Sequence, residues 1–545
     1  MQHMETTIAQ DVGWLLSNAR QYSGVDGVQT AAGFARAGGF EPVHRSAVVR
    51  WEHGQVPITH DIVRRYETVL GLPYGQLLSA VEYLAQLDDR HHRIPFLSAP
   101  WALGDREIAQ ALFDRALDGG ALTGQDWDRL TGFLQNRDEW LIRSVDWAAL
   151  IRRLSLEVSV HVGLEFTLRD QSLMRLAAHP RSAPALTAMA RRTLYDPTTQ
   201  VYSDIVGLLQ HSADPEGTAL LLEYLENPTA ESGLWVCLFT TATQVRRGLL
   251  TPAQTVKAAQ IALSLMRDEA RSVRIHRESA NLLRRIDPPT RSRIINALSA
   301  ESRKRIARIV AQGSAVADHE VDALTRSLEI RLRQTMSMTR WTTTLDRLVR
   351  TAVTTTHDEE RGRALAVLML TPQAPAVASA YATQLSEAWF NDEPTLIDDA
   401  LGALSWVVQP GQADELVELA FQAATDPITT LTAAGAAGNA RVTRRTAARI
   451  TARTSALAAD QLRRGHPDPK SLARAHAYLL GMWGQTERLA DLAGQAALHG
   501  VSPEWLTSFQ WWLDLPAWAL PEPLPPADVR EGQPAAGRGW SRGGR

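Results

Sequence analysis

The sequence predicts an all-α protein in which a small five-helix domain precedes a long array of short helices. Apolar residues recur at helical spacing along most of the chain, and no comparable run of alternating β-branched residues indicates a strand. Asp-Pro pairs, in which the aspartate can cap a helix that the proline begins, stand at residues 196, 214, 287, 426 and 468. Short helices with one apolar stripe bury it best by stacking in pairs, which predicts an α-solenoid-like helical-repeat array. An irregular bundle is the alternative.

Four segments are expected along the chain. Residues 1–90 form the five-helix domain, 91–100 a linker, 101–519 the helical-repeat sensor or interaction domain, and 520–545 a disordered tail rich in Pro, Gly and Arg. Two prolines interrupt the helical pattern in the linker. The tail has too few apolar residues to form a core.

The composition of the 545 residues is that of a globular protein in an aqueous compartment. Hydrophobic residues make up 45% and charged residues 21% of the chain, and its net charge of −3 does not indicate a bulk polyanion partner. The single cysteine, Cys237, excludes an intramolecular disulfide and a cysteine-rich zinc site. The amino end lacks a secretory signal, and prolines and polar residues interrupt the longest uncharged window. The sequence therefore predicts a cytoplasmic protein with no membrane partner.

The stretch from Val43 to Gly54 predicts a short helix with two unlike faces. Val48 and Trp51, three positions apart, share an apolar face. The opposite face carries Arg45, Ser46, Val49 and Arg50. Arginine can pair with O6 and N7 of guanine, serine can donate or accept at several base edges, and valine can contact a thymine methyl group. These residue types therefore suit a helix that lies in the major groove of DNA.

This stretch resembles the third helix of the Xre/Cro-type helix-turn-helix. That helix commonly has valine, a small polar pair, an aliphatic residue, arginine, Trp-Glu, a basic residue and glycine. The matching positions here are Val43, His44 to Ala47, Val48, Arg50, Trp51-Glu52, His53 and Gly54. Residues 14–20, 30–39, 58–70 and 71–78 look like the other four helices of the family, so the resemblance covers about residues 10 to 85.

The resemblance implies a DNA-binding domain whose recognition helix contacts double-stranded DNA. Val48 and Trp51 would form the core side of this helix, with His44 capping its start and Gly54 ending it. The DNA-binding residues would be His44, Arg45, Ser46, Val49, Arg50 and His53. The sequence departs from the family at Ala31, where glutamine usually contacts phosphate, and in a longer turn over residues 39–43.

Charge supports a competing interpretation. Residues 1–85 hold six arginines and eight acidic residues, and a helix with two arginines is commonly a solvated face.

Two later segments are basic: residues 267–308 have twelve basic and five acidic residues, and residues 441–464 have seven basic residues and one acidic residue. They could contact DNA or a phosphorylated ligand from the concave side of the array, or be solvated faces offset by acidic ones.

The sequence lacks the common catalytic and nucleotide-binding motifs in the structural context that each requires. It has no Gly-x-x-x-x-Gly-Lys-Ser/Thr loop, no His-Glu-x-x-His and no Gly-x-Gly-x-x-Gly after a strand. It also has no Gly-x-Ser-x-Gly elbow between a strand and a helix, because the match at Gly539 to Gly543 lies in the Gly/Arg-rich tail. The pair His91-His92 is interpreted as part of the linker, and no metal site is expected there. The sequence predicts no enzyme, no catalytic residue and no cofactor.

The expected function is a sequence-specific DNA-binding transcriptional regulator. The helical array would sense a protein or small-molecule effector, or set the geometry of a dimer; a homodimer stays open because the sequence shows no interface. The alternative is a helical-repeat protein-interaction scaffold, or a defence-associated protein, in which the first domain is a docking module.

Overall fold

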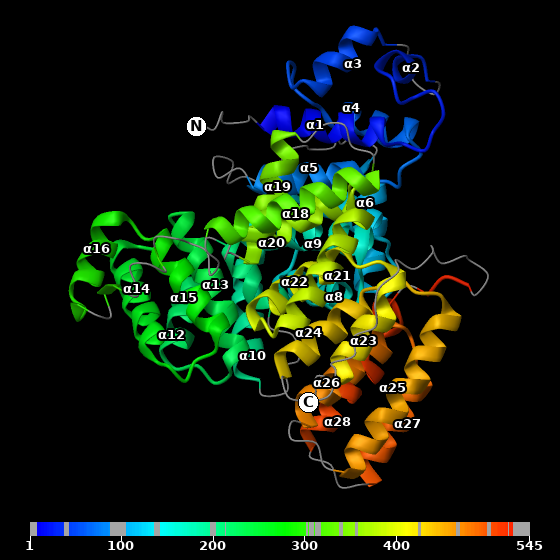
Figure 1. Ribbon diagram of the computed structural model, residues 1–545. Coiled ribbons are helices and arrows are strands. Elements are labelled where there is room, and N and C mark those ends of the chain that lie inside the picture. Colours follow the sequence, from blue (N-terminus) through cyan, green and yellow to red (C-terminus); the bar gives the residue numbers. More distant parts are fainter. Residues whose placement is uncertain are drawn as a thin grey trace.

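The computed structural model shows a chain of short helices (Figure 1). It describes residues 8–37, 43–87, 105–135, 142–196, 203–212, 214–300, 303–304, 310, 318–336, 342–354, 358–422, 427–464, 469–498, 503–521 and 523–526. In these ranges every regular element is an α-helix or a short 3-10 helix, and none is a strand. The predicted all-α class is therefore confirmed.

Five helices lie at the amino end, as expected. They are α1 (Ile8–Gln21), α2 (Ala31–Arg36), α3 (Arg45–Glu52), α4 (His60–Val69) and α5 (Gln76–Leu87). Helix α1 begins before the expected residues 14–20, and α5 extends beyond the expected residues 71–78. Threonine side chains cap the amino ends of α2 and α4. The hydroxyl of Thr30 accepts a hydrogen bond from the Gly33 amide, and the hydroxyl of Thr59 accepts one from the Ile62 amide. The longer turn expected before α3 lies largely outside the described residues, which omit 38–42.

A first array follows, in which helices stack in two rows. One row is α6, α8, α10, α12, α14 and α16, and the other is α7, α9, η2, α13 and α15, each packed on the next. The elements are α6 (Asp105–Leu117), α7 (Gly124–Gln135), α8 (Ser144–Val160), α9 (Gly163–Ala178), η1 (Pro180–Ser182), α10 (Ala183–Tyr195), α11 (Ser203–Val206), η2 (Gly207–Gln210), α12 (Pro215–Glu226), α13 (Glu231–Arg246), α14 (Pro252–Arg267), α15 (Val273–Arg285) and α16 (Pro288–Asn296). This stacking is what a helical-repeat array requires.

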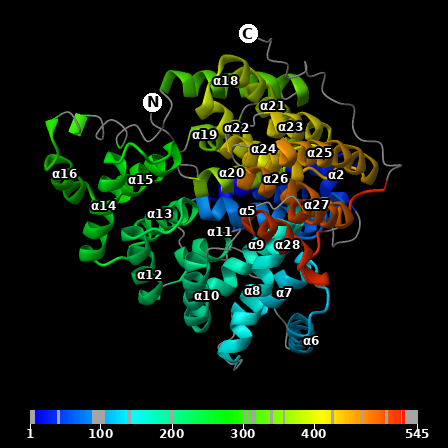
Figure 2. The same cartoon turned by 90° about the horizontal axis from the view of Figure 1, so that it is seen from below.

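A second array repeats the arrangement. Helices α20, α22, α24, α26 and α28 form one row and α23, α25 and α27 the other. The elements are α18 (Asp318–Met336), α19 (Thr343–Thr354), α20 (Asp358–Met369), α21 (Ala374–Asn391), α22 (Pro394–Val407), η3 (Pro410–Gln412), α23 (Ala413–Gln422), α24 (Pro427–Gly438), α25 (Arg444–Arg464), α26 (Pro469–Met482), α27 (Thr486–Leu498), α28 (Pro503–Leu513) and η4 (Ala517–Ala519). Figure 2 shows the two arrays diverging from a common centre.

Aspartate caps begin two of the helices predicted from Asp-Pro pairs. The side chain of Asp214 accepts from the Glu216 amide at 3.2 Å, and that of Asp287 accepts from the Thr290 amide at 2.8 Å. Asp196 ends α10, and the proline that follows it lies outside the described residues. Helices α24 and α26 begin at the expected prolines, but the aspartates before them lie outside the described residues.

The hydrophobic core joins the amino-terminal helices to the second array. Buried residues of α1 to α5 form one cluster with those of α18 to α28 and with Val160 and Met174 of the first array, while the other buried hydrophobic residues of α6 to α16 form a second cluster. Helix α5 packs on both α20 and α9. Two buried acids add polar contacts: Asp11 of α1 lies 2.6 Å from Arg347 of α19, and Glu82 of α5 lies 2.6 Å from Arg175 of α9. The expected linker, residues 91–100, lies outside the described ranges.

The carboxyl end packs against both arrays. Phe509 is fully buried in the core of the second array, and Trp518 lies under the guanidinium of Arg153 in α8, 4.8 Å from its ring centre. The expected disorder is wrong for residues 520–521 and 523–526, which are described. Leu524 is buried, and the carbonyl of Pro525 accepts from the Arg444 amide at 3.0 Å. Residues 527–545 are not among those described.

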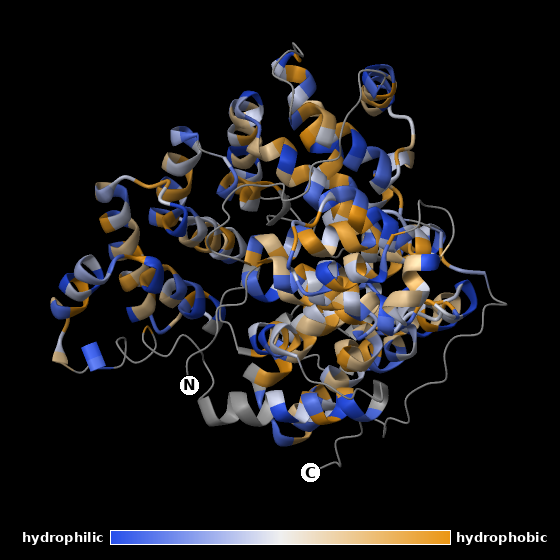
Figure 3. Cartoon of the chain, turned by 90° about the horizontal axis from the view of Figure 1, so that it is seen from above, coloured by the Kyte–Doolittle hydropathy of each residue, from blue (hydrophilic) through white to orange (hydrophobic). Residues whose placement is uncertain are grey.

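Most helices carry both hydrophobic and hydrophilic residues (Figure 3). This mixture is typical of helices that bury one side and leave the other in water. Among the residues that the structure describes, none of the helices is both long enough and apolar enough to cross a bilayer.

Candidate nucleic-acid interface

Helix α3 has one side in the core and the other in solvent. Val48 is fully buried, and Trp51 is half-buried with its ring centre 6.5 Å from that of Tyr66 in an edge arrangement. The exposed side carries Arg45, Ser46, Arg50 and His53, with Val49 partly exposed beside them. The two faces expected from the sequence are therefore present.

Local hydrogen bonds define both ends of α3. The ring Nδ1 of His44 accepts from the Ser46 amide at 3.2 Å and lies 2.7 Å from the Ser46 hydroxyl, so His44 caps the helix as expected. The ring of His53 lies 2.7 Å from the Val49 carbonyl. Gly54 then turns the chain with φ of +62°, a conformation that favours glycine.

Glu52 fixes the end of α3 to two other helices. Its carboxylate lies 2.6 Å and 2.7 Å from Nε and Nη2 of Arg20 in α1, and both side chains are about 5% exposed. Tyr66 of α4 donates its hydroxyl to the same carboxylate at 2.9 Å. Burial lowers the pKa of Arg20, but the hydrogen bond and charge of Glu52 outweigh this and raise it. Arg20 also donates to the carbonyl of Gln29, ahead of α2.

Helices α1 and α3 meet almost backbone to backbone. A Cβ atom on Gly13 of α1 would lie 2.6 Å from the carbonyl oxygen of Glu52, and one on Gly54 would lie 2.6 Å from the backbone of Ala9. No real Cβ atom is tolerated at that distance without a shift of the chain. The two glycines therefore allow α1 to hold α3 rigidly from behind.

The exposed side of α3 is positively charged. Arg45 and Arg50 make no ion pair among the described residues, and Arg36 of α2 lies exposed nearby, with its Nε donating to the Ala32 carbonyl. The acid of α3, Glu52, is neutralised by Arg20. In Figure 1, α2 and α3 lie at the outer end of the molecule, away from both arrays.

No family model, curated protein or solved structure matches this chain. The function is therefore inferred from the residues of this chain and their geometry.

The two basic segments make ion pairs within the protein. The pairs are Arg277–Asp399, Arg285–Glu360, Arg271–Asp268, Arg449–Asp414 and Arg453–Asp414. The first two connect α15 of the first array to α22 and α20 of the second. At these positions the positive charge is paired with acids of the same chain, between helices in every case except the local pair Arg271–Asp268.

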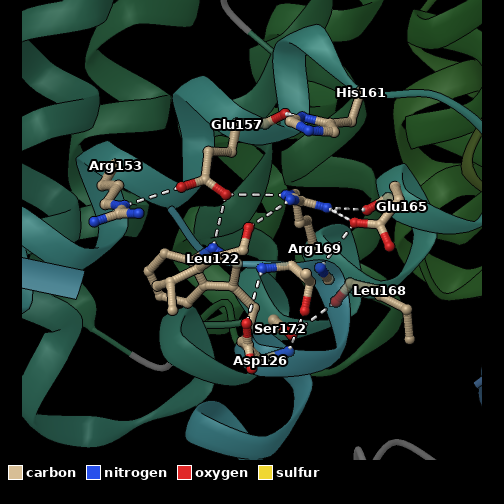
Figure 4. Close-up of polar contacts among 12 residues, drawn as sticks. Leu122, Asp126, Arg153, Glu157, His161, Glu165, Leu168, Arg169 and Ser172 are labelled. Atoms are coloured by element: carbon tan, nitrogen blue, oxygen red, sulfur yellow. Dashed lines mark hydrogen bonds and ion pairs between the residues drawn. The ribbon is translucent and has the colours of Figure 1, made fainter. Parts of the chain in front are cut away.

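A buried cluster of charged side chains connects α7, α8 and α9 of the first array (Figure 4). Glu157 of α8 accepts from Nε of Arg153 at 2.9 Å, from Nε of Arg169 at 2.9 Å and from the indole of Trp127 at 2.8 Å. Arg169 also donates to the carbonyl of Leu122 at 2.9 Å. Because the protein's own donors occupy both oxygens of Glu157, the cluster stabilises α7, α8 and α9 and does not present a general base.

Neither metal ligands nor an activated thiol were found in the described part of the chain. No group of three His, Cys, Asp or Glu residues could hold a metal ion there, and the pair His91-His92 lies outside it. Burial raises the pKa of the Cys237 thiol, as expected for a core cysteine.

Sequence reasoning identified the exposed residues of α3 but missed the residues that hold the helix. The sequence indicates no role for Glu52 beyond its place in the Trp-Glu pair. It indicates none for Arg20 beyond its place at the end of the first helix. The missed signal is the pair formed by the acid of α3 and the arginine at the end of α1, because both side chains needed a partner of opposite charge once they were buried.

Proposed function

We propose that this protein is a sequence-specific DNA-binding transcriptional regulator, with α3 as the recognition helix in the major groove. Arg45 and Arg50 would contact guanine edges, Ser46 a neighbouring base edge, and Val49 a thymine methyl group. His44 and His53, at the two ends of α3, would lie near the phosphate backbone.

One observation carries this proposal: the arginine-bearing side of α3 is exposed while its opposite side is anchored. A recognition helix must be held in place by its own domain and must be accessible to a DNA duplex. Val48 and Glu52 supply the anchor, and Arg45 and Arg50 project into solvent without an ion pair among the described residues. An arginine held only by water is available for bidentate contact with guanine.

Selection from a random double-stranded pool, followed by fluorescence anisotropy with the full chain, tests the proposal. Arg45→Ala and Arg50→Ala should each weaken binding to the selected sequence by about 1–3 kcal/mol. Both variants should also reduce the discrimination between selected and random DNA, because guanine contacts carry the sequence preference.

Arg152→Ala is the matched control, because Arg152 is an exposed arginine on α8 of the first array. Its affinity for the selected sequence should equal that of the unaltered protein. If Arg45→Ala and Arg50→Ala also bind with unchanged specific affinity, α3 is not the recognition helix. If no sequence is enriched from the pool, the interaction-scaffold alternative is favoured.

A further inference from the structure

A cavity of about 350 Å³ lies where the amino-terminal helices and the two arrays meet. Its wall combines Tyr83 of α5, Asp170 of α9, Trp235 of α13 and Arg363 of α20, with further residues from α8, η2, α15 and α22. This volume is within the range of small-molecule sites, which commonly lie between structural units.

Glycines keep this cavity open. Gly207, Gly362 and Gly402 all line it. A Cβ atom on Gly207 would meet nothing within 4 Å, and one on Gly402 would meet only Arg361, at 3.9 Å. Larger side chains at these two positions would have room to enter the cavity, so the empty space depends on the glycines.

Aromatic rings cover two sides of the cavity. Trp235 and Phe239 of α13 stack with their ring centres 5.8 Å apart, and Phe166 of α9 meets Trp406 of α22 edge to face at 5.6 Å. The Nε1 atom of Trp235 is buried and has no hydrogen-bond partner within the described part of the protein. A planar ring with an acceptor at its edge would complement this wall.

Positive charge prevails among the lining residues. Arg274, Arg361 and Arg363 line it together with one acid, Asp170, which accepts a hydrogen bond from Tyr83 at 2.9 Å. Arg361 also pairs with Asp399, which is not part of the lining, at 2.7 Å. Arg274 lies over the ring of Trp235, with its guanidinium carbon 3.6 Å from the ring centre. With Asp399 counted, the three guanidiniums face two carboxylates, and the formal charge of +1 favours an anion.

We propose that this cavity binds a planar aromatic anion of about the size of a nucleoside monophosphate. The ring lies between the aromatic pairs, and the anionic group lies at Arg274 and its neighbouring guanidiniums. Gln210 of η2, whose buried side-chain oxygen has no partner among the described residues, accepts a hydrogen bond from a ring substituent.

The ligand also regulates DNA binding, a consequence that rests on the proposed function. Tyr83 belongs to α5, which packs with α1 and α4, and α1 holds α3 through Arg20 and Glu52. A ligand that draws α9, α13 and α20 together must therefore act on the helix that positions the DNA-binding helices.

Binding of anilinonaphthalene sulfonate, an aromatic anion with a planar naphthalene ring whose fluorescence rises in apolar surroundings, tests the site on the full chain. The unaltered protein should bind one dye molecule saturably. Gly402→Leu, which fills the cavity, should weaken binding at least about tenfold. Gly494→Leu is the control, since Gly494 lies exposed on α27 with nothing near its Cβ position. Circular dichroism shows whether each variant is folded.

Arg274→Met separates the contribution of charge from that of shape. This variant should bind the sulfonate dye about tenfold more weakly but bind the uncharged analogue phenylnaphthylamine as the unaltered protein does. Equal loss for both ligands overturns the anion assignment. Unchanged dye binding by folded Gly402→Leu, or no saturable binding by the unaltered protein, overturns the site itself. If Gly402→Leu does not fold, Gly207→Leu replaces it.

Anisotropy with the selected DNA then tests the regulation. Saturating dye should change DNA affinity at least about fivefold in the unaltered protein but not in Gly402→Leu. Equal affinity with and without dye overturns the regulatory role and leaves the site standing. Failure of the protein to select any DNA would overturn the proposed function, while the dye titrations would still decide whether the cavity binds its ligand.

Discussion

Asn18 of α1 and Gln373, at the start of α21, exchange two side-chain hydrogen bonds. The amide of Asn18 donates to Gln373 at 2.8 Å, and that of Gln373 donates to Asn18 at 2.7 Å. Both side chains are buried. Asn18→Ala should lower the free energy of unfolding by about 1–3 kcal/mol, because it leaves the Gln373 amide buried without its partner. Urea denaturation of the full chain measures this loss.

A double-mutant cycle provides the control for this pair. The loss in Asn18→Ala combined with Gln373→Ala should be smaller than the sum of the single losses, because the two residues interact directly. Additive losses would mean that the reciprocal pair does not form.

Glu52→Ala should destabilise the protein by about 3–5 kcal/mol and weaken DNA binding, although it alters no proposed base contact. The substitution leaves the guanidinium of Arg20 buried without its anion. Glu223→Ala is the comparison, because Glu223 pairs with Arg191 at 3.2 Å on an exposed surface and should cost less than about 1 kcal/mol. Equal losses in the two variants would contradict the anchoring role of Glu52.

Gly13→Ala and Gly494→Ala should change stability in opposite directions. The new methyl group at position 13 would press on the backbone of Glu52, which should cost about 1–3 kcal/mol. At position 494 the helix is exposed and the space is open, so alanine should add about 0.5–1 kcal/mol. Thermal unfolding of both variants tests the close approach of α1 and α3, and a stabilised Gly13→Ala would refute it.

His161 should make the protein less stable in acid. Burial, and then the charge of Arg169, lower its pKa to about 4, against 6.5 for the ordinary residue. Between these values the unfolded chain binds a proton that the folded protein does not. The contribution of His161 is therefore complete above pH 6.5 and is lost as the pH falls to about 4, amounting to about 3 kcal/mol.

His161→Gln removes this titration. Urea denaturation at several pH values should show a smaller decrease in stability for the variant than for the unaltered protein between pH 6.5 and 4. Parallel decreases would show that His161 is not the responsible group. Other acid-sensitive groups affect both proteins alike, so the difference between the two curves isolates His161.

The helix class and the two faces of α3 followed from the sequence because they depend on local spacing. Val48 and Trp51, three positions apart, must share a face wherever the helix lies. The start of α3 was likewise predictable from His44. The base contacts proposed for Arg45 and Arg50 stay predictions, because they depend on a DNA partner and not on the chain alone.

Contacts between distant segments were not predictable. Arg277 and Asp399 are 122 residues apart, and Arg363 and Gln86 are 277 apart, so no periodic pattern connects them. The number of basic residues around Arg277 indicated a surface for nucleic acid or another anionic ligand. The acidic partner of Arg277, Asp399, belongs to the other array. The aromatic cavity was missed for the same reason, since its wall comes from many elements.

The shared core also constrains how the newly made chain acquires its structure. Asn18 leaves the ribosome 355 residues before Gln373, which at roughly 5–20 residues per second corresponds to about 20–70 seconds. During that interval the apolar surfaces of α1 and α5 lack their cover from the second array. The nascent amino-terminal segment therefore keeps apolar surface in contact with water until the last third of the polypeptide emerges.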